Sequence, residues 1–274
     1  MSAPAQRFLS PTVLEAAFDV AVSAAREAGA AVRGFYKDAY TVKDKGEDNP
    51  LTDADLASND ILERRLRGAF PEFGWLSEET ADTAERLERR AVWIIDPVDG
   101  TKEFTLGIPE FVVSISLVVD GEALLGVLYN PIQEQLFAGL IGGSDGRRAL
   151  FNGAPMGVSA HPTVQGARIV CSRTEMKKGW FDQYADQGVV PVPVGSVAYK
   201  FGLVAAGQAE ATFTPQPRHE WDIAGGVAVV HAAGGRCTDR HGLPFQFNAP
   251  KPLVDGIVCT NGHIHDDLRA VMNR

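Results

Sequence analysis

The sequence predicts an α/β protein, and three observations carry this prediction. Apolar residues recur at helical spacing over the first 70 residues, paired apolar runs of strand length fill the middle of the chain, and strand-like and helix-like segments alternate beyond residue 150. With 274 residues, of which 45% are hydrophobic, the chain can bury a large core.

Two amphipathic helices are expected at the start of the chain. From Pro11 to about Lys37 the apolar positions step mostly by three or four, and Ser10 is placed to cap this helix. A second helix should begin near Thr52 and stop before Pro71. The polar stretch 43–50 between them is a candidate mobile segment.

The sequence of the middle of the chain predicts strands joined by tight turns. Residues 73–76 and 91–95 have strand length, and the second of these runs ends at Asp96. Segments 111–119 and 123–130 flank Asp120-Gly121, as in a β-hairpin, and 134–141 is a candidate third strand. Asn152-Gly153 is a further turn signal.

The second half alternates between the two kinds of element. Segments 167–172, 209–213 and 256–260 resemble strands, whereas 197–207 and 222–235 resemble helices. We therefore expect an N-terminal α+β subdomain over 1–150 and a C-terminal α/β subdomain over 151–274. They should form one structural unit with a soft boundary, because no linker separates them.

Composition excludes several classes of function. The chain has 26 basic and 35 acidic side chains, a net charge of -9, and no dense basic block, so a nucleic-acid polymer is not an expected partner. Three widely spaced cysteines without a CxxC pair indicate neither a disulfide framework nor a zinc site. With no apolar run of membrane-spanning length, we expect a cytoplasmic protein.

The stretch "DPVDGT", residues 96–101, is the first candidate site. Asp96 follows an apolar strand, a proline fixes the backbone, and Gly100 permits a sharp turn, so Asp96, Asp99 and the Val98 carbonyl can face one point. Hard cations such as Mg²⁺ prefer oxygen ligands of this kind. A helix starting at Thr101 would also direct the Gly100 and Thr101 amides toward a phosphate. A simple turn is the alternative interpretation.

Three other acidic segments are individually ambiguous. Glu78 and Glu79 follow a strand but could be a solvated pair, and Asp222 in "EWDIAGG" could simply cap a helix. The group of Thr52, Asp53 and Asp55 also sits at a helix start, where capping residues are common.

Taken together, "DPVDGT" and "WDIAGG", with "SEE" upstream, resemble the two signature motifs of the inositol monophosphatase family, and the resemblance covers nearly the whole chain. It implies a layered αβαβα fold, related to that of fructose bisphosphatase, with two mixed sheets between helices. It also implies an Mg²⁺-dependent, commonly lithium-sensitive phosphatase that is often dimeric. Two or three Mg²⁺ ions would be bound by Glu78, Asp96, the Val98 carbonyl, Asp99 and Asp222, and Thr101 and Asp55 would hold and activate the attacking water.

This chemistry suits the residue types, because metal ions can lower the pKa of water and absorb charge on a phosphoryl group. No covalent nucleophile is evident: no cysteine has an arginine six positions later, and residues 53–57 lack a DxDxT pattern. We therefore expect direct attack by water on a small phosphorylated metabolite.

The substrate is less clear from the sequence. Inositol monophosphatases usually carry Asn where this chain has Glu103, and a substrate-binding Glu where it has Pro215, seven residues before Asp222. "GTKEF", "YNP", "CSR" and Lys200 instead resemble the 3'(2'),5'-bisphosphate nucleotidase branch, which acts on 3'-phosphoadenosine 5'-phosphate. Lys200 would then meet the second phosphate, although its spacing from Gly195 matches the inositol branch and an exposed helix lysine is the simpler interpretation.

Other readings stay open at this stage. Gly195, Ser196 and Arg218 are further candidate substrate contacts, whereas a solvated loop also explains Arg218 and His219. Inositol-1-monophosphatase is the main alternative activity, followed by a fructose-1,6-bisphosphatase or a histidinol-phosphate phosphatase. A metal- or phosphate-binding protein without turnover is the alternative from another class. The charged segment 80–90 is either a flap over the metal site or a surface helix.

Overall fold

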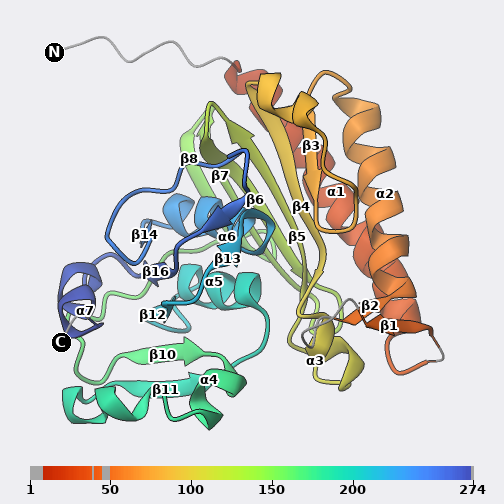
Figure 1. Ribbon diagram of the computed structural model, residues 1–274. Coiled ribbons are helices and arrows are strands. Elements are labelled where there is room, and N and C mark those ends of the chain that lie inside the picture. The colour runs from red at the N-terminus through yellow and green to blue at the C-terminus, as the bar shows by residue number, and fades with distance from the viewer. Residues whose placement is uncertain (1–8, 39, 45–49, 273–274) are drawn as a thin grey trace, which may run out of the picture.

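The computed structural model describes residues 9–38, 40–44 and 50–272. The polar stretch expected to be mobile therefore lies largely outside the described residues. Within them the elements form five layers, helix, sheet, helix, sheet and helix, as expected (Figure 1).

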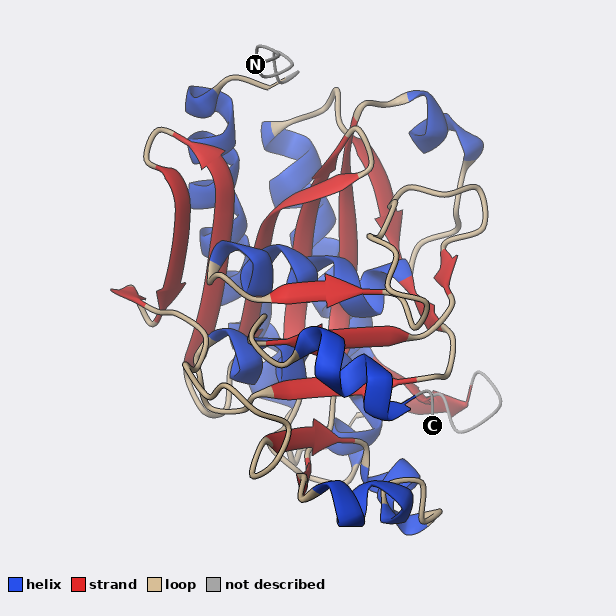
Figure 2. Cartoon of the chain, turned by 90° about the vertical axis from the view of Figure 1, so that its left-hand side faces the viewer, coloured by secondary structure: helices blue, strands red, loops and turns tan. Residues whose placement is uncertain are grey.

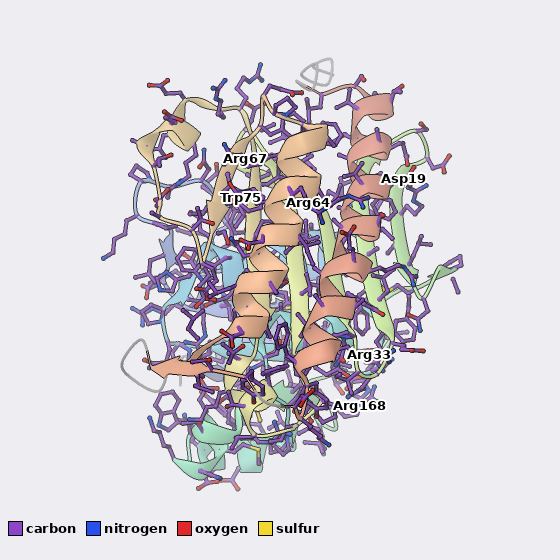
Figure 3. The ribbon with its side chains drawn as sticks, turned by 90° about the vertical axis from the view of Figure 1, so that its right-hand side faces the viewer. Asp19, Arg33, Arg64, Arg67, Trp75 and Arg168 are labelled. Carbon is purple, nitrogen blue, oxygen red and sulfur yellow. The ribbon has the colours of Figure 1, made fainter. Side chains whose placement is uncertain are left out.

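The first layer is a pair of long helices, α1 (Pro11–Phe35) and α2 (Asp53–Ala69). Both caps are those that the sequence predicts: Ser10 accepts from the Val13 amide, and Thr52 forms a capping box with Asp55. Figure 3 shows the helices side by side on the outer face, with Arg33 on α1 and with Arg64 and Arg67 on α2. Their apolar faces pack on the first sheet.

The first sheet has seven strands in the order β3-β4-β5-β6-β7-β8-β9, and only β3 and β4 are parallel. Its strands are β3 (Gly74–Ser77), β4 (Ala91–Asp99), β5 (Val112–Val119), β6 (Glu122–Asn130), β7 (Gln135–Gly143), β8 (Gly146–Phe151) and β9 (Ala154–Pro155). The two predicted turns join β5 to β6 and β8 to β9, with positive φ at Asp120-Gly121 and Asn152-Gly153. The sheet thus extends past residue 150, and the proposed subdomain boundary there stays a prediction.

The middle layer consists of α5 (Val197–Ala205) and α6 (Glu220–Ala232), which lie between the two sheets (Figure 1). Helix α6 packs tightly on the first sheet, because a Cβ on Gly126 would fall 2.1 Å from the Gly225 carbonyl oxygen. This close approach requires glycine on β6.

The second sheet has five strands in the order β11-β10-β12-β16-β14 and is also mixed. Its strands, which cross those of the first sheet in Figure 2, are β10 (Arg168–Cys171), β11 (Val190–Pro193), β12 (Ala211–Thr214), β14 (Arg236–Thr238) and β16 (Ile257–Thr260). Helices α4 (Arg173–Lys177) and α7 (His265–Met272) belong to the outer layer.

The remaining described elements are short: β1 (Val42–Asp44), β2 (Pro50–Thr52), α3 (Thr101–Thr105), β13 (Arg218–His219), β15 (Leu253–Val254) and the 3₁₀ helices η1 (Ala84–Glu88) and η2 (Asp182–Gln187). Segment 80–90 is thus a coil with one 3₁₀ turn. Its Arg86 is buried, bonds Asp82 and Asn248, and fixes this segment against the body of the protein. Among the described residues, no helix has the length and apolar character needed to span a membrane.

Candidate active site

Strand β4 runs four residues past the apolar run 91–95 and carries both aspartates of "DPVDGT". Asp96 pairs with Ser114 and Asp99 with Val112, and the register shifts between them. Residues three apart on a regular strand point to opposite faces, whereas a bulge can turn both toward one side. The irregularity therefore brings Asp96 and Asp99 to the same cavity.

Gly100 ends this strand in a conformation that other residues rarely adopt, with φ of 101°. An added Cβ would lie 3.0 Å from both the Glu110 carbonyl oxygen and the Ser196 Cβ. The glycine thus serves the turn and the close packing at the start of α3.

The carboxylates of Asp96, Asp99 and Asp222 converge in the cavity, with one oxygen from each within 4.8 Å of the others. Asp222 comes from the first turn of α6, at the third helical position rather than the cap, and forms a capping box with His219. Asp222 is distant in sequence from Asp96 and Asp99, which share β4, so the three carboxylates meet only in the folded chain.

Burial raises the pKa of all three carboxyl groups, that of Asp99 to about 6. Mutual repulsion adds to this effect, since Glu78 raises the pKa of Asp96, and Asp99 raises that of Asp222. Such crowding of buried carboxylates is unfavourable without a cation. Their oxygen donors and their convergence fit a bound divalent ion such as Mg²⁺.

Each aspartate is also held by a hydrogen bond to one of its oxygens. Asp96 Oδ1 accepts from the Val98 amide at 3.0 Å, and Asp222 Oδ2 accepts from the His219 amide at 3.0 Å. Asp99 Oδ2 accepts from the Ser196 hydroxyl and from the Ala198 amide, the latter at 2.6 Å. The other oxygen of each side chain is thus available to a ligand.

Two further groups predicted from the sequence border this cluster. Glu78 directly follows β3, and its amide donates to the Ile95 carbonyl at 3.2 Å. Glu78 also lines the cavity that holds the three aspartates. Thr101 Oγ1 lies 3.0 Å from Asp55 Oδ1 and 2.9 Å from the Val98 carbonyl oxygen. Asp55 is in turn fixed by the amide and hydroxyl of Thr52 at 2.8 and 2.5 Å.

The cavity that holds these groups has a volume of about 260 Å³. The stacked rings of His219 and Trp221, whose centroids are 4.3 Å apart, line it. Its floor is acidic, and Lys102 stands at its edge. The site thus combines a buried carboxylate cluster with room for a small substrate.

Comparison with known proteins agrees with this geometry. The family model described as "Inositol monophosphatase family" matches residues 14–273. The chain belongs to the inositol monophosphatase family. It is therefore an Mg²⁺-dependent phosphomonoesterase, which confirms the fold and the reaction class expected from the two motifs.

Relatives within the family carry two different substrate names. The chain is 33% identical to inositol monophosphatase 3 from Solanum lycopersicum, over 95% of this chain and 97% of that protein. It is also 33% identical to the 3'(2'),5'-bisphosphate nucleotidase CysQ from Escherichia coli O157:H7, over 84% and 94% of the two chains. Identity alone therefore does not distinguish these activities.

Solved structures of the family show the same fold. The extragenic suppressor protein suhB from Bartonella henselae aligns with a TM-score of 0.81 at 29% identity, covering 94% of this chain and 99% of that one. An IMPase from Thermotoga maritima also has a TM-score of 0.81, at 27% identity, covering 93% and 96%.

The loop before α5 places Gly195 and Ser196, and Lys200 lies on α5 itself. The Gly195 amide donates to Glu110 Oε2 at 2.6 Å, and the Glu103 side chain packs so closely on Gly195 that a Cβ would overlap it. Ser196 points toward Asp99, which gives it a role that the sequence does not indicate.

Lys200 is buried, with 6% of its surface exposed, and is thus not the exposed helix lysine of the simpler interpretation. Burial lowers the pKa of its ammonium, while the Glu175 and Asp99 carboxylates oppose this effect. Within the described part of the chain the ammonium takes part in no hydrogen bond or ion pair.

Arg218, whose charge acts on Lys200, and Arg173 are already paired with carboxylates. Arg173 Nη1 lies 2.5 Å from Glu110 Oε2, and Arg218 Nη2 lies 3.7 Å from Glu175 Oε1. Glu110 and Glu175 were missed in the sequence, because isolated glutamates without a motif resemble surface residues. Only the folded chain shows that they pair with these arginines.

Proposed function

We propose that the protein removes one phosphate from a small ester that carries a second anionic group, with 3'-phosphoadenosine 5'-phosphate as the leading substrate. The observation that supports this proposal is the buried ammonium of Lys200. An unpaired buried charge is costly, and a ligand phosphate beside it would offset that cost. The relation to the Escherichia coli bisphosphate nucleotidase agrees with this choice.

In this proposal Glu78, Asp96, the Val98 carbonyl, Asp99 and Asp222 hold two or three Mg²⁺ ions. When bound, the ions supply Lewis acidity at the phosphoryl oxygens and favour ionisation of water. The amides of Gly100 and Thr101 bind the phosphate to be removed, while Gly195, Ser196, Lys200 and Arg218 line the side that faces the rest of the substrate.

The attacking water is held by Thr101, whose hydroxyl lies within hydrogen-bond distance of Asp55 Oδ1 and of the Val98 carbonyl. Thr101 Oγ1 accepts a hydrogen bond from the water and passes a proton toward Asp55 Oδ1. Because Thr52 engages the other Asp55 oxygen, Oδ1 keeps its orientation toward Thr101. The side chains thus orient the water before attack.

Direct attack has a stereochemical test. Hydrolysis, in isotopically labelled water, of an ester whose phosphoryl group is made chiral by sulfur and oxygen isotopes should invert the configuration at phosphorus. Retention of configuration would indicate two displacements through a phospho-aspartate intermediate and refute the direct attack.

The substrate is tested by phosphate release with Mg²⁺ from 3'-phosphoadenosine 5'-phosphate, inositol 1-phosphate, fructose 1,6-bisphosphate and histidinol phosphate. We expect the first to have the highest kcat/KM. Lys200→Met should lower that value about 10- to 100-fold, the loss of one charge-assisted contact, and leave inositol 1-phosphate nearly unchanged. Lys177→Met on α4 is the exposed control and should have no effect.

Inositol 1-phosphate is the second candidate, because the inositol monophosphatases of Solanum lycopersicum match a larger share of the chain than the nucleotidases do. A higher kcat/KM for inositol 1-phosphate would favour it. Silence on all four esters with intact Mg²⁺ binding would refute both substrate assignments. Homodimer formation and lithium sensitivity are further proposals, which sedimentation and an assay with LiCl would test.

A further inference from the structure

Cys237 and Cys259 lie directly opposite each other on two neighbouring strands of the second sheet. Strand β14 pairs with β16 in antiparallel register, with Cys237 opposite Cys259. Both cysteines are free and buried, and both belong to the apolar core that contains α6. We propose that this pair is an oxidation site, at which a hydroperoxide such as hydrogen peroxide converts the two thiols to a reversible disulfide that links β14 covalently to β16.

The strand register places the two residues at the separation that a disulfide needs. Directly opposed residues of an antiparallel pair have Cα atoms about 4.5–5.5 Å apart, within the range of roughly 4.4–6.8 Å that disulfides span. Because both side chains project to the same face of the sheet, their sulfur atoms can meet without a change in the backbone. A hydrogen bond already joins the two thiols.

Contacts on the other face of the sheet hold this register. Thr238 and Thr260 follow the two cysteines in sequence and project to that face, because side chains alternate along a strand. Thr238 Oγ1 lies 3.1 Å from His265 Nε2, and Thr260 Oγ1 lies 3.0 Å from His265 Nδ1. One buried imidazole thus joins β14 to β16 and opposes slippage of one strand past the other.

Cys237 is the thiol that should react first. His231, in the last turn of α6, accepts a hydrogen bond from the Cys237 amide at 3.2 Å, so its imidazole lies beside this residue. Burial raises the pKa of the Cys237 thiol, but hydrogen bonds with Cys259 and His231 outweigh burial and hold this pKa below its usual range. Burial and the contact with Cys237 both raise the pKa of Cys259. Because the thiolate is the nucleophile, Cys237 should attack the peroxide and Cys259 should complete the link.

A small oxidant can approach this pair from the surface. Strand β14 has three residues and lies at the edge of the described sheet, where local opening is easiest. His231 also lines a cavity of about 310 Å³, whose walls include Phe245 and Phe247. Hydrogen peroxide is close to water in size, so this cavity can admit it as far as the imidazole beside Cys237.

The oxidation proceeds in two steps that together consume one peroxide. Cys237 Sγ attacks one peroxide oxygen and the O–O bond breaks, which leaves a sulfenic acid on Cys237, and the departing hydroxide takes the thiol proton to form water. Cys259 Sγ then attacks Cys237 Sγ and the S–O bond breaks, so a second water leaves with the Cys259 proton. The two thiols lose two electrons and the peroxide gains them.

The first test uses the wild-type protein. After treatment with hydrogen peroxide and unfolding in denaturant, titration with a thiol reagent should find one free thiol instead of three, and dithiothreitol should restore the other two. Mass spectrometry of a non-reduced digest should link the peptides that contain Cys237 and Cys259. Three remaining thiols, or a link from Cys171 to either residue, would overturn the proposal.

Variants of the three cysteines test the order of the two steps. In Cys259→Ala the reaction should stop at a sulfenic acid on Cys237, which dimedone traps, whereas Cys259 should stay unlabelled in Cys237→Ala. Cys171→Ala is the control and should form the wild-type link, because Cys171 lies on β10, away from the pair. Labelling of Cys259 in Cys237→Ala would overturn the assigned order. The wild-type mapping needs no substitution, so it decides the proposal even where a variant does not fold.

The link should also stabilise the protein. It closes the loop between residues 237 and 259 and so limits the conformations of the unfolded chain. Oxidised wild type should therefore unfold at a higher denaturant concentration than the reduced protein, whereas peroxide should leave the midpoint of Cys259→Ala unchanged. A lower midpoint in the oxidised wild type would overturn the stabilising role of the link.

Discussion

Ser196 offers a sharp test of how the second half of the chain positions Asp99. Its hydroxyl donates to Asp99 Oδ2 and also accepts from the Tyr199 amide at 2.9 Å as the cap of α5. Ser196→Ala removes both contacts, while the Ala198 amide still holds Asp99. The cap accounts for about 1 kcal/mol and the bond to a charged group for about 1.5–3 kcal/mol.

We therefore expect the free energy of unfolding of Ser196→Ala to fall by about 2.5–4 kcal/mol. Its Mg²⁺ affinity should fall about 10- to 100-fold, as for groups that orient metal ligands. Chemical denaturation measures the first quantity and calorimetric titration with Mg²⁺ the second. Ser172→Ala removes the comparable cap of α4, which is not near Asp99, and should affect stability alone. Unchanged Mg²⁺ affinity in Ser196→Ala, or an equal loss in Ser172→Ala, would refute the reasoning.

Three further changes have defined outcomes. Gly100→Ala places a residue with a Cβ in the left-handed backbone conformation, with that Cβ 3.0 Å from the Glu110 carbonyl oxygen. The denaturation midpoint of the variant should therefore drop by an amount equivalent to about 2 kcal/mol or more, and a stable, active variant would contradict this. Glu220→Gln should cost about 1–3 kcal/mol in thermal unfolding, because the buried carboxylate accepts from the amides of residues 248 and 249 and an amide group can satisfy only one of them; no shift in Tm would count against it. Burial lowers the pKa of His265 to about 4 in the folded state, so the neutral imidazole contributes fully to the free energy of unfolding above pH 6.5. This contribution, about 1–3 kcal/mol after allowance for solvent screening, is lost as pH falls toward 4. His265→Asn should therefore lose less stability than the wild type over this pH range, and parallel curves for the two proteins would contradict this.

Local features of the fold could be predicted because their signals lie within a few residues. Ser10 and Thr52 cap helices through contacts to amides two or three positions away, and Asp120-Gly121 adopts the positive φ angles that a tight hairpin needs. Such features depend on backbone preferences that the sequence states directly.

Of the candidate site residues, the structure brings Asp96, Asp99 and Asp222 together, but the contacts that arrange them could not be predicted from the sequence. The bulge between Asp96 and Asp99 arises from pairing with β5, and the bond from Ser196 to Asp99 joins residues 97 positions apart. The burial of Lys200 depends in the same way on the packing of α5 between the two sheets. These features depend on tertiary contacts, so no local sequence pattern predicts them.

The carboxylate cluster is tested most directly by phosphate release from 3'-phosphoadenosine 5'-phosphate and inositol 1-phosphate, with Mg²⁺, in the Asp96→Asn variant. Asp60→Asn, on the exposed side of α2, is the charge-matched control. We predict that Asp96→Asn loses at least about 100-fold in kcat on any ester that the wild type hydrolyses, keeps a cooperative unfolding transition and binds Mg²⁺ more weakly, and that the control keeps wild-type values. Wild-type turnover in Asp96→Asn would contradict the metal site.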